Sequence, residues 1–202
     1  MIFSVVLTAF VLVAPVELPD ETMFATLVLA SRFRPLPVLT GVSAAFALQT
    51  AIAVAAGSLI SLLPREWVAA GVAVLFATGA VLLWRSAAAT NSHVDGGTAA
   101  NQDWRAWRIA LASFVITFLA EWGDLSQLAT AGLAARYDAP LSVFVGAFAA
   151  LLLIASLAVF VGGRLVAHLP FGLVRRTAAV LFVAFAVLAA YEAVTAFTAV
   201  TA

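Results

Sequence analysis

The sequence predicts an all-α membrane protein of six transmembrane helices, arranged as two inverted three-helix repeats. Hydrophobic residues make up 65% of the 202-residue chain and charged residues only 10%, and the mean hydropathy is +1.14. This composition is far from that of a typical soluble domain. The apolar residues fall into six runs, each long enough to cross a bilayer at roughly 20 residues per span. Polar positions in the first three runs recur in the last three.

The six predicted spans follow one another with short connections, and prolines lie near most of the breaks, where helices end most easily. The spans are residues 3–31, 38–63, 67–88, 106–135, 141–166 and 173–199. The start of the chain is apolar like a signal peptide, but it lacks a basic beginning, and acidic residues stand where a small-residue cleavage site would be. We therefore expect it to remain as part of the first span.

A polar, glycine-bearing stretch over residues 90–98 separates the two repeats and is typical of a loop. We predict a first repeat over residues 1–89, a cytoplasmic loop over 90–104 and a second repeat over 105–202.

Matching polar residues support the duplication, because chance similarity between apolar helices rarely extends to charged positions. The pairs are Glu17 with Glu121, Asp20 with Asp124, Thr22 with Ser126 and, after one inserted residue, Gly41 with Gly146. Three spans per repeat is an odd number, so the two copies enter the membrane from opposite sides. Many secondary transporters are built in this way, with their sites near the membrane midplane.

The placement of arginine predicts the orientation. Eight arginines fall at the first, third and fifth connections between spans: Arg32, Arg34, Arg85, Arg105, Arg108, Arg164, Arg175 and Arg176. The other two, Arg65 and Arg136, fall on the opposite side. Because basic residues favour the cytoplasmic side, we expect both termini outside. We expect a multi-pass protein of the cell inner membrane, surrounded by the lipid bilayer.

Several classes of function are disfavoured. The net charge is zero, so the sequence gives no sign of a nucleic-acid partner, and the absence of cysteine excludes disulfides and thiolate metal sites. The predicted spans contain no Ser–His pair and no His–Glu zinc motif, so we expect no enzyme and no resident cofactor. Nothing in the sequence points to an oligomeric state.

Two acidic clusters lie inside predicted spans. Their acids are Glu17, Asp20 and Glu21 in the first repeat and Glu121 and Asp124 in the second. A charge at the bilayer centre costs roughly 2.5–3.5 kcal/mol, so five acids are expensive unless they neutralise a cation. Carboxylate, carbonyl and hydroxyl oxygens suit hard divalent ions such as Mn²⁺, Ca²⁺ and Mg²⁺. Carboxylates held close together also share protons, and this gives a chemical basis for exchange of metal against protons.

Pro19 and Gly123 lie in the middle of the two clusters and are expected to interrupt the helices there. A break would let the acids converge with the hydroxyls of Thr22 and Ser126, with Gln127 as a further candidate ligand. The alternative is that these acids pack between helices or lie at the membrane interface. Gln49, inside the second span, is either a further ligand or an interhelical hydrogen-bonding residue.

The second cluster, Glu121-Trp122-Gly123-Asp124-Leu125-Ser126, resembles the signature Glu-x-Gly-Asp-Lys/Arg-Thr/Ser of the Gdt family, except at the basic position. That family comprises the Golgi and thylakoid cation/proton exchangers and bacterial manganese-exporter relatives, with one signature in each three-helix repeat. The first cluster keeps the signature's Glu, Asp and hydroxyl but has Pro19 for its glycine and Glu21 for its basic residue. The resemblance extends over nearly the whole chain.

The resemblance implies export of Mn²⁺, or of Ca²⁺, in exchange for protons. The implied metal ligands are Glu17, Asp20, Glu121 and Asp124, assisted by Thr22, Ser126 and Gln127. Glu21, if it faces the site, adds a fifth acid. The alternatives are a lysine-exporter-like transporter of another metal or a small cationic metabolite, and a non-transporting membrane scaffold with vestigial clusters. Glu192, toward the end of the last span, is either interfacial or part of a proton relay.

Overall fold

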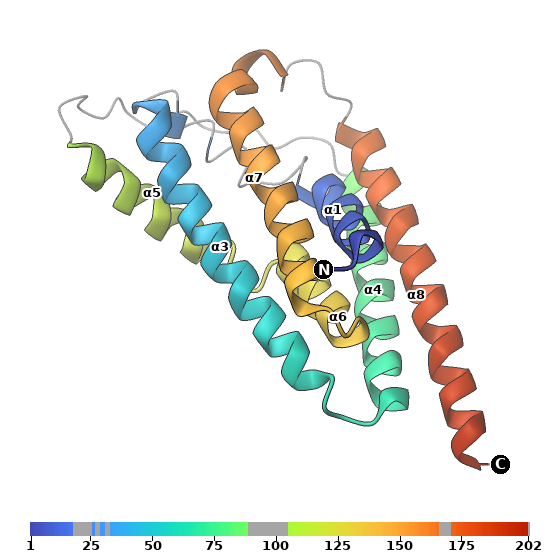
Figure 1. Cartoon of the computed structure of the whole chain (residues 1–202). Coiled ribbons are helices and arrows are strands. Elements are labelled where there is room, and N and C mark those ends of the chain that lie inside the picture. The colour runs from blue at the N-terminus through green and yellow to red at the C-terminus, as the bar shows by residue number, and fades with distance from the viewer. Residues whose placement is uncertain (18–25, 27–28, 31–32, 89–104, 166–170, 202) are drawn as a thin grey trace.

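The computed structural model describes residues 1–17, 26, 29–30, 33–88, 105–165 and 171–201. These residues form α-helices and contain no β-strand (Figure 1). The helices are α1 (Phe3–Glu17), α3 (Pro35–Ile60), α4 (Arg65–Ala88), α5 (Ala106–Ala120), α6 (Leu125–Arg136), α7 (Pro140–Leu165) and α8 (Phe171–Thr201).

Among the described residues, three helices are long and apolar enough to cross a membrane unaided. They contain the segments Pro35–Ile60 in α3, Pro140–Phe160 in α7 and Arg176–Thr198 in α8. α5 and α6 pass the same test together but meet at an angle of 73°, so they form one broken span or a re-entrant loop. The segments Phe3–Glu17 and Glu66–Leu82 are apolar but shorter. The chain is therefore an all-helical, multi-pass membrane protein, as the composition predicts.

The helix boundaries agree closely with the apolar runs of the sequence from residue 35 onward. Only part of the first predicted span is covered, because residues 18–25, 27–28 and 31–32 lie outside the described part of the chain. The predicted loop at 90–104 lies entirely outside the described residues.

The helices pack in a small number of extended pairs. α4 runs along α8, α1 runs along α7, and α3 lies against α5, α6 and α7 (Figure 1). One apolar cluster centres on Phe76, Leu133 and Phe182, where α4, α6 and α8 meet, and a second joins α1, α3, α5 and α7 around Val13, Val42 and Leu151. Many large apolar side chains outside these clusters are exposed, as expected for helices that face lipid.

Three of the described glycines allow close approach of helix backbones, among them Gly57 on α3, which faces the carbonyl of Ala131 on α6. Gly41 on α3 faces the carbonyl of Ala110 on α5, and Gly146 on α7 faces the carbonyl of Val6 on α1. A Cβ atom at any of these glycines would overlap the facing carbonyl, so each helix pair is in contact at a spacing that only glycine permits.

The two chain termini lie at the same end of the helix bundle. The amide of Ile2 donates to Oγ of Ser142, at the start of α7, over 2.8 Å. The α3–α4 turn, the α6–α7 turn and the last part of α8 line one common pocket at that end. The described helices thus return to the side from which α1 starts.

Candidate metal site

The break between α5 and α6 is built by local sequence. α5 ends at Ala120, and Gly123 adopts φ +80°, a left-handed conformation that favours glycine. Asp124 then caps the start of α6, its carboxylate accepting the amide of Ser126 over 3.0 Å. The predicted interruption at Gly123 is confirmed.

Two glutamine side chains bind the backbone, one just before this break and one within it. Gln49 on α3 donates from Nε2 to the carbonyl of Phe118, in the last turn of α5, over 3.0 Å. Gln127 on α6 accepts the amide of Gly123 at its Oε1 over 2.9 Å. Backbone groups freed at a helix break need such partners, because hydrocarbon offers none.

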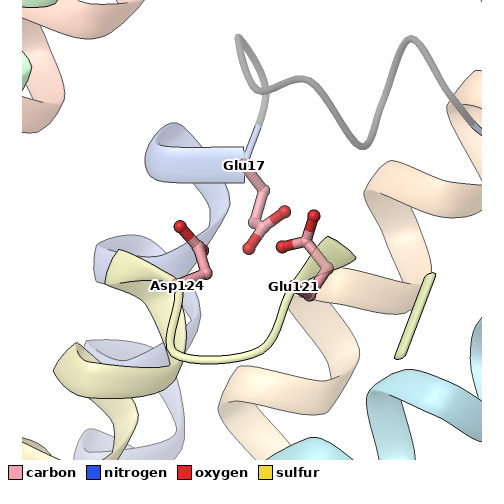
Figure 2. Close-up of side chains that lie close together, drawn as sticks. All are labelled: Glu17, Glu121 and Asp124. Atoms are coloured by element: carbon pink, nitrogen blue, oxygen red, sulfur yellow. The ribbon is translucent and has the colours of Figure 1, made fainter. Parts of the chain in front are cut away.

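Three carboxylates meet at the break. Glu17, the last residue of α1, points toward Glu121 and Asp124, which flank the turn between α5 and α6 (Figure 2). One oxygen of each carboxylate lies within 4.8 Å of the others. Glu17 and Glu121 are buried, with exposed fractions of 2% and 5%, and Asp124 is half-buried. Acids from two distant parts of the chain thus form one compact group.

The depth of this group follows from its neighbours. Phe46, Gln49 and Thr50 on α3 and Leu151 on α7 line a small pocket together with Glu121. These residues lie near the middle of α3 and α7, two apolar helices of 26 residues each, which are about 39 Å long at 1.5 Å per residue. The carboxylates therefore lie near half the depth of the candidate spans.

Hydroxyl groups complete the pocket. Ser126 and Thr130 on α6 line it with Gln127. Thr50 donates its hydroxyl hydrogen to the carbonyl of Phe46 over 2.7 Å, and Thr130 donates to the carbonyl of Ser126 over 2.8 Å. Because each hydrogen is engaged within its own helix, the oxygen lone pairs remain as acceptors. The pocket thus adds hydroxyl oxygen beside the carboxylates.

The structure brings together Glu17, Glu121 and Asp124, with Ser126 and Gln127 beside them. Asp20, Glu21 and Thr22, the other predicted site residues, lie outside the described residues. Thr50 was not predicted, since a threonine inside an apolar helix gives no signal that it faces a site. Gln49 makes the interhelical hydrogen bond that was one of its two predicted roles.

A larger pocket lies at the end of the bundle that holds the termini. It is lined by the α3–α4 turn, the α6–α7 turn and the end of α8. Its arginine and glutamate neutralise each other, because Arg136 donates to Glu192 over 2.7 Å. We place the candidate site at the carboxylate group, where acids gather at mid-depth.

A multi-pass helical protein with carboxylates gathered at mid-depth has the features of an ion transporter of the membrane. Comparison with known families agrees. The model of the family described as divalent cation/proton antiporter GDT1 matches residues 5–91 and 109–197. The chain belongs to this family, which is a family of transporters and not of enzymes.

Individual relatives agree with this membership. A GDT1-like protein of Synechocystis is 35% identical over 80% of this chain and 85% of its own length. A candidate manganese exporter of Vibrio cholerae is 31% identical over 94% of this chain and 92% of its own length. GDT1-like protein 3 of Arabidopsis thaliana is 29% identical over 92% of this chain and 70% of its own length. No solved structure matches the chain significantly.

Proposed function

We propose that this protein is a secondary transporter that exports a divalent cation, Mn²⁺ first and Ca²⁺ second, in exchange for protons. The observation that carries the proposal is the meeting of Glu17 with Glu121 and Asp124 at mid-depth, their carboxylate oxygens within 4.8 Å of one another. Membership of the family supports divalent cations and protons as substrates. The relative from Vibrio cholerae is named as a candidate manganese exporter.

Electrostatics explains why such a group exchanges two kinds of ion. Three ionised carboxylates this close repel one another strongly in a low-dielectric environment. A divalent cation relieves the repulsion, and so do protons, but both cannot occupy the same oxygens. A cycle in which one replaces the other therefore couples metal movement to proton movement.

The proposed ligand set joins the two acidic clusters. Glu17, Glu121 and Asp124 supply carboxylate oxygen, and Ser126 lies beside them. Gln127 remains a further candidate, because an amide oxygen has two lone pairs and the Gly123 amide uses one. Asp20, Thr22 and Glu21 remain predictions for the first cluster. Hard cations with several oxygen ligands fit this set better than Zn²⁺ or Cu⁺.

We propose that the fold comprises six spans in two inverted repeats, residues 1–89 and 105–202, joined by a cytoplasmic loop at 90–104. The glycine contacts support it. Gly41 meets Ala110 and Ser113, whereas Gly146 meets Val6 and Ala9. Ala110 and Ser113 follow Val6 and Ala9 by 104 residues each, the same shift that relates Glu17 to Glu121. Exchanging the two halves thus exchanges the two contacts.

We propose that both termini lie outside the cell inner membrane and that the arginine-rich connections lie in the cytoplasm. The common location of the two termini at one end of the bundle supports an even number of crossings. In this orientation, transport from the arginine-rich side is export.

Purified protein in proteoliposomes tests the function. We expect Mn²⁺ flux that increases when the proton concentration is higher on the side toward which Mn²⁺ moves. We also expect a smaller flux of Ca²⁺, and movement of protons in the direction opposite to that of the metal. Flux of a monovalent or organic cation alone would favour another lysine-exporter-like transporter. If no tested cation moves, the proposal is wrong and a scaffold with vestigial clusters is favoured.

A further inference from the structure

The candidate site depends on a helix break, and a helix break in a membrane is costly unless its backbone groups find partners. α5 ends at Ala120 and α6 begins at Leu125. The carbonyls in the last turn of α5 lose the amides that a continuous helix would place against them. Glu121 stands at this end as the C-cap of α5, so its position depends on how firmly the end of α5 is held.

Gln49 holds the end of α5 from the other half of the protein. Its Nε2 donates to the carbonyl of Phe118, three residues before Glu121. The Gln49 side chain is 4% exposed, and a buried amide that lost this acceptor would pay the full cost of desolvation. Breaking this hydrogen bond is therefore unfavourable, and the bond holds the end of α5 against α3.

Gln127 fixes the other side of the turn, because its Oε1 accepts the amide of Gly123. The turn that carries Glu121 and Asp124 is thus held at a carbonyl before it and at an amide within it. We call these two hydrogen bonds the glutamine bracket. Of these two glutamines, Gln49 reaches the turn from another helix, so it is the one that fixes the turn relative to α3.

The position on α7 that matches Gln49 holds no polar side chain. In the proposed repeat register, which relates Gly41 to Gly146, Gln49 corresponds to Ile154 on α7 and Thr50 corresponds to Ala155. Ile154 and Ala155 are buried and apolar. On α3, Gln49 thus hydrogen-bonds the end of α5 next to Glu121, whereas the matching positions on α7 hold apolar side chains.

We propose that Gln49 is a positioning residue for cation transport: it holds the end of α5 so that the Glu121 carboxylate stays in place opposite Glu17. The inference rests on the proposed function. Its consequence is that the turn with Glu121 and Asp124 is held in place before the cation binds. Loss of the Gln49 donor is expected to weaken cation binding substantially and to change the maximal transport rate much less.

The test replaces Gln49 by methionine, which keeps the shape of the side chain and removes the donor. Ile154→Met, at the matching position on α7, is the control. All variants are made with Trp122→Cys, whose position in the turn is 59% exposed. Because the chain has no cysteine of its own, a spin label attached there reports the mobility of the turn alone. Mn²⁺ flux, thermal unfolding and label mobility are measured for the full chain in proteoliposomes.

We expect Gln49→Met to increase the mobility of the label and to raise the apparent KM for Mn²⁺ about tenfold, in the range of outer-shell substitutions at metal sites, with the maximal rate changed less than about twofold. Ile154→Met is expected to change neither quantity. Gln49→Asn, whose amide is one methylene shorter, provides the same comparison if Gln49→Met fails to fold.

Unchanged label mobility and unchanged KM in the Gln49 variants would overturn the inference. So would equal changes in the Ile154 control, because they would show a general packing effect. If the parent protein moves no divalent cation but the label still responds to Gln49→Met alone, the proposed transport is wrong while the bracket itself is supported.

Discussion

The two halves of this protein carry a matching glutamate, Glu17 and Glu121, with different residues at the matching positions around it. Glu17, the last described residue of α1, and Glu121, the C-cap of α5, are both buried, and they match in the proposed repeat. Around Glu121, α3 supplies Gln49 and Thr50. The matching positions on α7 are Ile154 and Ala155. In the proposed repeat, the residues that bind the ion are needed in both halves, whereas the residues that position those ligands can diverge.

The largest expected effect tests whether both halves take part in transport. Glu17→Gln and Glu121→Gln each remove one charge from a group of three while keeping the side-chain shape. We expect each to reduce Mn²⁺ flux more than about 100-fold, beyond the range typical of outer-shell substitutions. Both proteins should remain folded, since removing one of several repelling charges does not destabilise the empty site.

The measurement is initial flux in proteoliposomes, with thermal unfolding as the control for folding. A large loss in only one of the two variants would show that the other acid is structural and that the halves differ in function as well as in surroundings.

The second prediction concerns binding without transport. A cation that binds only the folded protein stabilises it, by about 2.7 kcal/mol at a concentration 100 times its Kd. We expect Mn²⁺ to raise the unfolding temperature of the parent protein and to raise it far less in Glu17→Gln, Glu121→Gln and Asp124→Ala. Equal shifts in all four proteins would place the bound metal elsewhere.

The third prediction tests the symmetry of the packing. Gly41→Ala and Gly146→Ala each place a Cβ against a backbone carbonyl of the facing helix. We expect each to destabilise the fold by about 1–3 kcal/mol, the usual cost of overpacking. Gly71→Ala on α4 is the control, because a Cβ there meets nothing within 4 Å, and it should stabilise by about 0.4–1 kcal/mol.

Denaturant unfolding in detergent measures all three glycine variants. If Gly41→Ala and Gly146→Ala differ by more than their experimental error, the two helix pairs are not equivalent in energy, and the proposed repeat is less regular than the contacts suggest.

Much of this arrangement follows from the sequence, because hydrophobic length and repeated polar residues are local signals. The apolar runs predict the helix boundaries from Pro35 onward, and Gly123 predicts the break in the fourth span. The partners of isolated polar residues are not local. A glutamine in an apolar helix shows that a partner is needed, but the carbonyl of Phe118 is 69 residues away from Gln49 in the chain. The role of Asp20 as a metal ligand remains a prediction, because Asp20 lies outside the described residues.

The smallest expected effect concerns Glu192, for which the sequence left open an interfacial place or a proton relay. Glu192 lies at the end of the bundle, is 49% exposed and pairs with Arg136. An ion pair this exposed contributes roughly 0–1 kcal/mol, and the glutamine amide of Glu192→Gln can still accept from the guanidinium. We therefore expect Mn²⁺ flux within about twofold of the parent protein and nearly unchanged stability. A loss comparable to that of Glu121→Gln would place Glu192 on the proton pathway, and the acids would then extend well beyond the two matched clusters.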